Sequence, residues 1–124
     1  MTATCVFVYG TLRTGERNHH WISECPLLAR PACVEGFTLY DFGPYPIACP
    51  SPEADDRIAG ELYHISNPAT WKDLDHLEGY PDHYTRGEVR VRDSQGGIRT
   101  AFIYFMDKPP AQARRIPQGD WLQR

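Results

Sequence analysis

The 124-residue sequence lacks the signals that would assign it to several large classes of protein. It contains no run of about 18 apolar residues, so no segment is predicted to cross a membrane as a helix. Basic residues (13) and acidic residues (16) nearly balance, giving a net charge of -3 and no general attraction to nucleic acid or anionic lipid. We therefore expect neither a nucleic-acid partner nor a membrane partner, and the sequence leaves the oligomeric state open.

Cysteine and histidine occur without the spacings that make metal sites or disulfide frameworks. The four cysteines form no C-x-x-C pair, and the chain begins without the charged and apolar segments of an export signal. These features predict reduced, mostly buried thiols in a cytoplasmic protein, with one or two disulfides as the alternative. Asp75, His76, Asp82 and His83 match no recognised ligand spacing, so we interpret them as solvated residues and expect no metal.

Proline, by contrast, is abundant, at 11 of 124 residues, or about 9% against roughly 5% in average proteins. Proline interrupts helices and central strands, so this content favours short elements joined by stiff turns over a helical bundle. No repeat or linker divides the chain, and its length suffices for a core. We expect one domain over residues 1–124.

Alternating and continuous apolar segments predict more strands than helices. The expected strands cover residues 5–9, 32–42 (as one or two strands), 57–65, 84–93 and 98–106. The proline-rich residues 43–56 predict an edge segment followed by a surface loop, and Ile116 and Trp121 are expected to anchor the tail. These elements predict a small α+β fold built on a strongly curved sheet or a barrel.

The clearest helix signal is the segment SNPATWKDLDHLEGY. Asn67 is a good N-cap, Pro68 suits the first helical position and Gly79 suits the C-cap. The apolar face of this helix is formed by Trp71, Leu74 and Leu77.

Glu78 lies on the wrong side of this helix for a solvated residue. At 100° per residue its side chain projects between Trp71 and Leu74. Burying an unpaired carboxylate is costly, which leaves two interpretations. Either the last turn frays and Glu78 reaches water or an arginine, or the carboxyl lies in a pocket where burial and the helix dipole raise its pKa. The second arrangement suits a general acid–base catalyst.

The segment CVFVYGTLRTGERNHHWI ends a buried strand in a glycine-bounded turn. Gly10 allows the backbone to approach a ligand closely, and such a turn can aim several N–H groups at an anion. A helix that begins near Asn18 would add a favourable dipole. The turn matches neither GxxxxGK[ST] nor GxGxxG, so an ordinary strand-to-helix loop is the competing interpretation. His19 and His20 are expected at the surface, and Asn18 either caps the helix or braces the turn.

Two further candidates remain open at this point. Tyr84 is either a core residue with a satisfied hydroxyl or a hydrogen-bond donor in a pocket. A cysteine nucleophile would need a histidine partner that the sequence does not place.

The blocks VFVYGTLRTGERNH and LDHLEGYPDHYTR, in this order, resemble the γ-glutamyl cyclotransferase-like family, which includes AIG2-like proteins and γ-glutamylamine cyclotransferases. Supporting blocks are YDFGPYP, GELYHI, FIYF and GDW. The resemblance extends from about Val6 to Trp121. It implies a small mixed β-barrel with flanking helices.

The resemblance also implies a reaction, in which the α-amine of a γ-glutamyl group attacks its own side-chain carbonyl and releases 5-oxoproline and an amine. The partner would be a small-molecule γ-glutamyl compound, and the chemistry requires no metal or organic cofactor. The implied site residues are catalytic Glu78 and substrate-binding Tyr9, Gly10, Thr11, Leu12 and Tyr84. Because folds outlive activities, a non-catalytic γ-glutamyl or amino-acid-binding module is the alternative, followed by a different lyase or transferase reaction.

Overall fold

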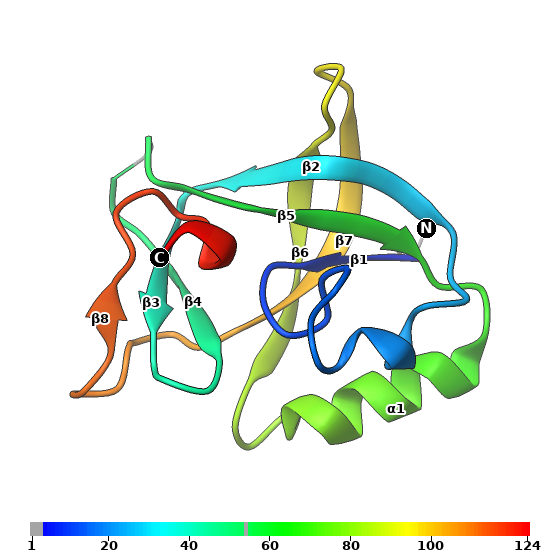
Figure 1. The fold of residues 1–124 in the computed structure, drawn as a ribbon, viewed down its shortest axis with the longest axis horizontal. Coiled ribbons are helices and arrows are strands. Elements are labelled where there is room, and N and C mark those ends of the chain that lie inside the picture. Colours follow the sequence, from blue (N-terminus) through cyan, green and yellow to red (C-terminus); the bar gives the residue numbers. More distant parts are fainter. Residues whose placement is uncertain (1–3, 54) are drawn as a thin grey trace.

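The computed structural model describes residues 4–53 and 55–124. Five strands close into a barrel in the order β1-β5-β2-β6-β7 (Figure 1). β1 pairs with β7 in parallel and every other neighbouring pair in the barrel is antiparallel, which confirms the mixed barrel implied by the resemblance. The bounds of these strands are Cys5–Val8 for β1, Leu27–Glu35 for β2, Arg57–His64 for β5, Thr85–Arg92 for β6 and Ile98–Phe105 for β7.

A second, three-stranded sheet lies beside the barrel in the order β4-β3-β8. Its strands are β3 (Phe37–Asp41), β4 (Pro46–Pro50) and β8 (Arg114–Arg115). Gly36 separates β2 from β3, so the expected segment 32–42 is two strands that belong to different sheets. β4 is an edge strand of its sheet, as its prolines predict, although four of its five residues are buried.

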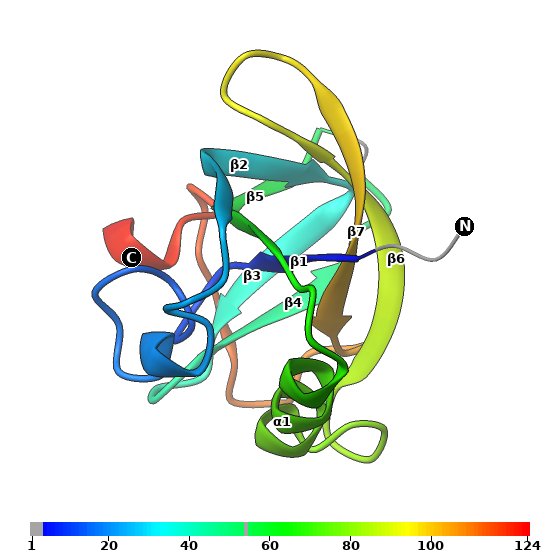
Figure 2. The same ribbon diagram turned by 90° about the vertical axis from the view of Figure 1, so that its right-hand side faces the viewer.

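The helix α1 (Pro68–Glu78) lies against one end of the barrel (Figure 2). The Ala69 amide donates to the Asn67 side-chain oxygen over 3.0 Å, which caps the first turn. Gly79 ends the helix in the left-handed conformation with φ of 67°, a geometry that glycine adopts without strain. Both predicted caps of this helix are therefore confirmed.

The core explains why the first strand is apolar throughout. Phe7 packs inside the barrel, whereas Val6 and Val8 contact a second cluster that includes Leu74 of α1. β1 is thus buried on both faces, and its end lies close to the helix. The expected anchors of the tail are also buried, with 3% of Ile116 and 2% of Trp121 exposed.

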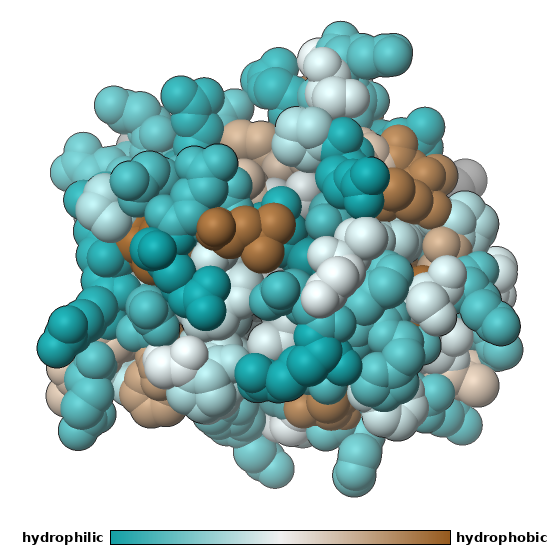
Figure 3. All heavy atoms as spheres, in the orientation of Figure 1, coloured by the Kyte–Doolittle hydropathy of each residue, from teal (hydrophilic) through white to brown (hydrophobic). Residues whose placement is uncertain are grey.

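Short 3-10 helices complete the described structure, η1 at His19–Trp21 and η2 at Trp121–Gln123. Neither these nor α1 is long and apolar enough to cross a membrane. The four cysteines all lie in the described residues and are unpaired. The face shown in Figure 3 is mostly hydrophilic, with apolar side chains in separate small groups. Such isolated groups are normal on folded proteins, so the search for a site turns to cavities.

Candidate functional site

A cavity of about 310 Å³ opens where β1 ends, between the turn that follows it and the C-terminal end of α1. The residues that line it come from separate parts of the chain, at positions 7–12, 17–18, 45–46, 77–78, 83–84 and 104. The two segments that the sequence singled out, the glycine-bounded turn and the end of the helix, therefore meet at one site. All six predicted site residues line this cavity.

The turn after β1 contributes Gly10, Thr11 and Leu12 to the cavity wall. The Arg13 amide donates to the Gly10 carbonyl over 3.0 Å, which closes the turn. Within residues 4–53 and 55–124, the amides of Thr11 and Leu12 donate to no protein acceptor, so both can donate to an anion. A Cβ added to Gly10 would overlap Cγ and Cδ of Pro46. Glycine is needed at this position because of the close contact with the proline ring.

Asn18 braces the turn. Its side-chain nitrogen donates to the Thr11 hydroxyl over 3.0 Å, and its amide donates to the Thr11 carbonyl over 2.9 Å. The expectation of a helix dipole at this point is wrong. The helix η1 has only three residues, and the Asn18 side chain makes no capping bond to it. So short a helix has little dipole, and any anion here would depend on the turn amides.

Glu78 is the last residue of α1 and lies half-buried in the cavity wall. The Gly79 amide donates to the carbonyls of Asp75 and His76, so the helix keeps its geometry to its end and does not fray. In the described part of the chain, the Glu78 carboxylate has no hydrogen-bonding or charged partner. Removal from water raises the pKa of Glu78 to about 7. The structure thus agrees with the pocket interpretation of this residue.

Two tyrosines form part of the same wall. The Tyr84 hydroxyl donates to the Pro46 carbonyl over 2.7 Å, and the Tyr9 hydroxyl donates to the Tyr104 carbonyl over 2.6 Å. Burial raises the pKa of both phenols well above the usual range, and the charge of Glu78 adds to the effect. Both stay protonated near neutral pH. Tyr84 therefore fits the first of its two interpretations, a core residue whose hydroxyl is satisfied by backbone, although it also lines the cavity.

Among the residues of the cavity wall that were not predicted from the sequence, three lie in loops and have polar side chains. Arg17, Tyr45 and His83 line the cavity, and the Tyr45 hydroxyl lies 3.1 Å from Nε2 of His83. His83 was expected to be only a solvated loop residue. All three belong to loops whose direction is set by closure of the barrel, and no local sequence pattern reports that direction.

Asp75 has a structural role close to the site. Nη1 of Arg86 lies 2.7 and 2.8 Å from its two carboxylate oxygens, and the Tyr104 hydroxyl donates to it over 2.6 Å. Arg86 also stacks over the Trp71 ring. These contacts fasten α1 to β6 and β7 one turn before Glu78. No group of three metal-ligating side chains is found in the residues that the structure describes.

Comparison with known proteins identifies relatives over nearly the whole chain. Residues 6–123 match the family described as "Gamma-glutamyl cyclotransferase, AIG2-like". The chain is 34% identical over 119 residues to the gamma-glutamylcyclotransferase family protein YtfP of Escherichia coli K12, covering 96% of both chains. It is 33% identical over 124 residues to the gamma-L-glutamyl-butirosin B gamma-glutamyl cyclotransferase of Niallia circulans, covering 95% of this chain and 75% of that relative.

The fold has solved counterparts of the same kind. The crystal structure of an AIG2-like protein from Mus musculus superposes with a TM-score of 0.75 at 25% sequence identity, covering 90% of this chain and 82% of that one. The mixed barrel with its flanking helices is therefore the fold of these proteins.

Proposed function

This chain belongs to the AIG2-like gamma-glutamyl cyclotransferase family, and on that premise we propose that it converts a small γ-glutamyl compound into 5-oxoproline and a free amine. The observation that carries the proposal is the meeting of Glu78 with the turn amides in one cavity. A carboxyl whose pKa is near 7 can exchange a proton at physiological pH, and N–H donors beside it can bind a carboxylate.

The reaction is an intramolecular transfer of an acyl group. The α-amine nitrogen of the glutamyl unit bonds to its side-chain carbonyl carbon, and the bond from that carbon to the leaving amine breaks. Two protons move from the attacking nitrogen to the amine that leaves, so the reaction consumes no water and needs no co-reactant. A site that folds the substrate into this ring-like shape removes much of the entropic barrier.

Glu78 serves as the base and then as the acid. As a carboxylate it takes a proton from the substrate ammonium, which makes the nitrogen nucleophilic, and it returns that proton to the nitrogen of the leaving amine. It carries the second proton, which the attacking nitrogen releases once the new bond has formed, to the leaving amine in the same way. Its half-buried position beside buried phenols supports this role, because those phenols stay uncharged and do not compete for the proton.

The turn binds the charged end of the substrate. We assign the unpartnered amides of Thr11 and Leu12 to the α-carboxylate or to the oxyanion that forms on the attacked carbonyl. One donor to such an oxyanion is typically worth about 10²–10³ in rate. Tyr9, Gly10 and Tyr84 complete the wall around the glutamyl unit. The scheme requires no metal or organic cofactor. The four unpaired cysteines accord with a cytoplasmic setting.

The test is direct. Purified protein is incubated with γ-glutamyl amino acids, γ-glutamylamines and γ-glutamylated metabolites, and 5-oxoproline is measured against a Glu78→Gln control. Release that depends on Glu78 supports the proposal. Calorimetric binding of one of these compounds without 5-oxoproline release would instead support the binding-module alternative. Absence of both would reject the assignment.

A further inference from the structure

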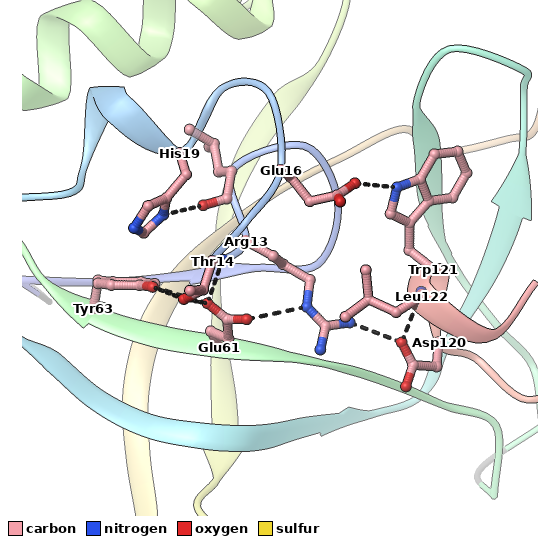
Figure 4. A network of polar contacts seen from close by, with 10 residues as sticks. Arg13, Thr14, Glu16, His19, Glu61, Tyr63, Asp120, Trp121 and Leu122 are labelled. Atoms are coloured by element: carbon pink, nitrogen blue, oxygen red, sulfur yellow. Dashed lines mark hydrogen bonds and ion pairs between the residues drawn. The ribbon is translucent and has the colours of Figure 1, made fainter.

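A buried ion cluster lies next to the substrate turn, outside the cavity wall (Figure 4). Its centre is Glu61 of β5, of which only 1% is exposed. Oε1 of Glu61 accepts from the Thr14 amide (2.9 Å), the Thr14 hydroxyl (2.8 Å) and the Tyr63 hydroxyl (2.8 Å). Oε2 accepts from Nε of Arg13 over 3.4 Å. Both carboxylate oxygens are therefore engaged, mainly by the two residues that follow Leu12.

The C-terminal segment completes the cluster. Nη1 of Arg13 donates to Oδ1 of Asp120 over 2.8 Å, so one guanidinium joins two carboxylates on separate elements. Nε1 of Trp121 donates to Glu16 over 3.0 Å, one step further along the same loop. Segments far apart in the sequence thus converge on residues 13–16.

The cluster keeps Glu61 charged despite its burial. Burial raises the pKa of Glu61, but the hydrogen bonds from Thr14, Tyr63 and Arg13 outweigh it and leave that pKa below its usual range. Buried ion pairs often contribute no more stability than apolar packing of the same volume. Stability alone therefore does not account for an arginine, two carboxylates and two hydroxyls gathered at this loop.

The place of these charged and polar groups in the chain, directly after the turn, does account for them. Arg13 and Thr14 follow directly after Thr11 and Leu12, which line the cavity, and the Arg13 amide itself closes the turn onto Gly10. A movement at Arg13 or Thr14 therefore moves the amides of those two residues. Asn18 holds the turn at Thr11, and Glu61 holds it at the following residues.

We propose that the contacts of Arg13 with Glu61 and Asp120, here called the clasp, fix the amides of Thr11 and Leu12 at the spacing that binds the substrate carboxylate. Glu61, Arg13 and Asp120 are positioning residues, because they do not line the cavity. The expected effect on KM rests on the proposed function. The expected effect on the rigidity of the turn does not, because it can be measured without a substrate. Through Asp120, the clasp makes the affinity of the site depend on the C-terminal segment.

Arg13→Lys is the sharpest variant, because it keeps the charge but loses the planar fork that reaches Glu61 and Asp120 together. Arg13→Lys and Glu61→Gln, made as separate single variants, should each raise KM about tenfold or more, with a smaller change in kcat. Thermal melting must show that each variant is folded at the assay temperature. The pH dependence of kcat should stay unchanged, because Glu78 keeps its surroundings. Glu35→Gln is the matched control, since Glu35 pairs with Arg92 at the surface with side chains 53% and 52% exposed. It should leave KM unchanged.

If Arg13→Lys and Glu61→Gln do not fold, a pair of smaller substitutions at Thr14 tests the same cluster. Thr14→Val removes the hydroxyl that donates to Glu61, whereas Thr14→Ser keeps it. We expect KM to rise about threefold or more in the first and to stay near wild type in the second. Unchanged KM in folded Arg13→Lys protein, or equal KM in the two Thr14 variants, would overturn the clasp as a determinant of affinity.

Amide hydrogen exchange gives a readout that does not depend on turnover. The amides of Arg13 and Thr14, which donate to Gly10 and Glu61, should exchange about tenfold faster in Thr14→Val than in Thr14→Ser or Glu35→Gln. Equal exchange in all three would show that the cluster does not order the turn. If wild-type protein releases no 5-oxoproline from any compound, the proposed function fails, and the exchange rates alone decide whether the clasp exists.

Discussion

The Tyr84 amide donates a hydrogen bond to the Glu78 carbonyl over 3.3 Å. Between them residues 79–83 form a tight loop, in which the His83 amide also donates to the Gly79 carbonyl over 2.7 Å. Gly79, with its positive φ, begins the reversal. The loop turns the chain back on the end of α1, so that both Glu78 and Tyr84 reach the cavity.

Glu78→Gln should lower kcat by about 10²–10⁴, because the amide keeps the shape of the side chain but cannot accept the substrate proton. Substrate binding should change little, since the turn amides are untouched. Steady-state release of 5-oxoproline measures kcat, and calorimetry with the slowly turned-over substrate measures affinity. Near-normal turnover by folded Glu78→Gln protein would remove Glu78 from the mechanism.

The stability of the protein should depend on pH through Glu78. Its pKa is about 7 in the folded chain and about 4.5 when unfolded, so the folded state holds the proton more tightly. Between these values the unfolded chain has released a proton that the folded chain retains. The stabilising contribution is therefore complete below pH 4.5 and is lost as pH rises to about 7.

Urea denaturation of wild type and Glu78→Gln from pH 4 to pH 8 tests this sign. The free energy of unfolding of wild type should fall relative to the variant across that range and then level off. Other groups that titrate in this pH range are common to both proteins. The contribution of Glu78 is therefore the difference between the two free energies of unfolding. A difference that is independent of pH would contradict the raised pKa.

The sequence predicted the parts of the site that have local signals. The end of α1 follows from its caps, and the helical angle of Glu78 put its side chain on the apolar face, which left a frayed last turn or a pocket as the two interpretations. Glu61 had no such signal. The alternation of a strand puts the apolar Ile58 and Leu62 on one face and Glu61 on the other, where a charged residue is usually solvated. The turn and the C-terminal segment cover that face, and only the closed barrel brings them there.

Activity should survive exhaustive treatment with EDTA. In the described residues no group of three metal-ligating side chains is close enough to hold an ion, and Asp75 is already bound to Arg86 and Tyr104. The proposed proton transfers need only Glu78. Turnover before and after chelation should agree within error, and loss of activity that one divalent metal restores would refute the metal-free scheme.

Gly10→Ala should lower both stability and substrate affinity, although alanine adds only one carbon atom. The new Cβ would overlap Cγ and Cδ of Pro46, whose carbonyl accepts the hydrogen bond from Tyr84. Relief of the overlap must move either the turn or Pro46 and, with it, Tyr84. We expect a loss of about 1–3 kcal/mol in the free energy of unfolding and a rise in KM, measured by urea denaturation and by 5-oxoproline release.

A second substitution shows whether the overlap is the cause. Pro46→Ala deletes the two ring carbons that a Cβ on residue 10 would meet, so Gly10→Ala should cost less in that background than in wild type. The four proteins form a double-mutant cycle, and the coupling free energy should be of the sign that marks rescue. Pro46→Ala alone supplies the baseline for any effect of losing the ring. If Gly10→Ala costs as much stability and affinity without the proline ring as with it, the contact with Pro46 is not what requires glycine, and the conformation of the turn itself must be responsible.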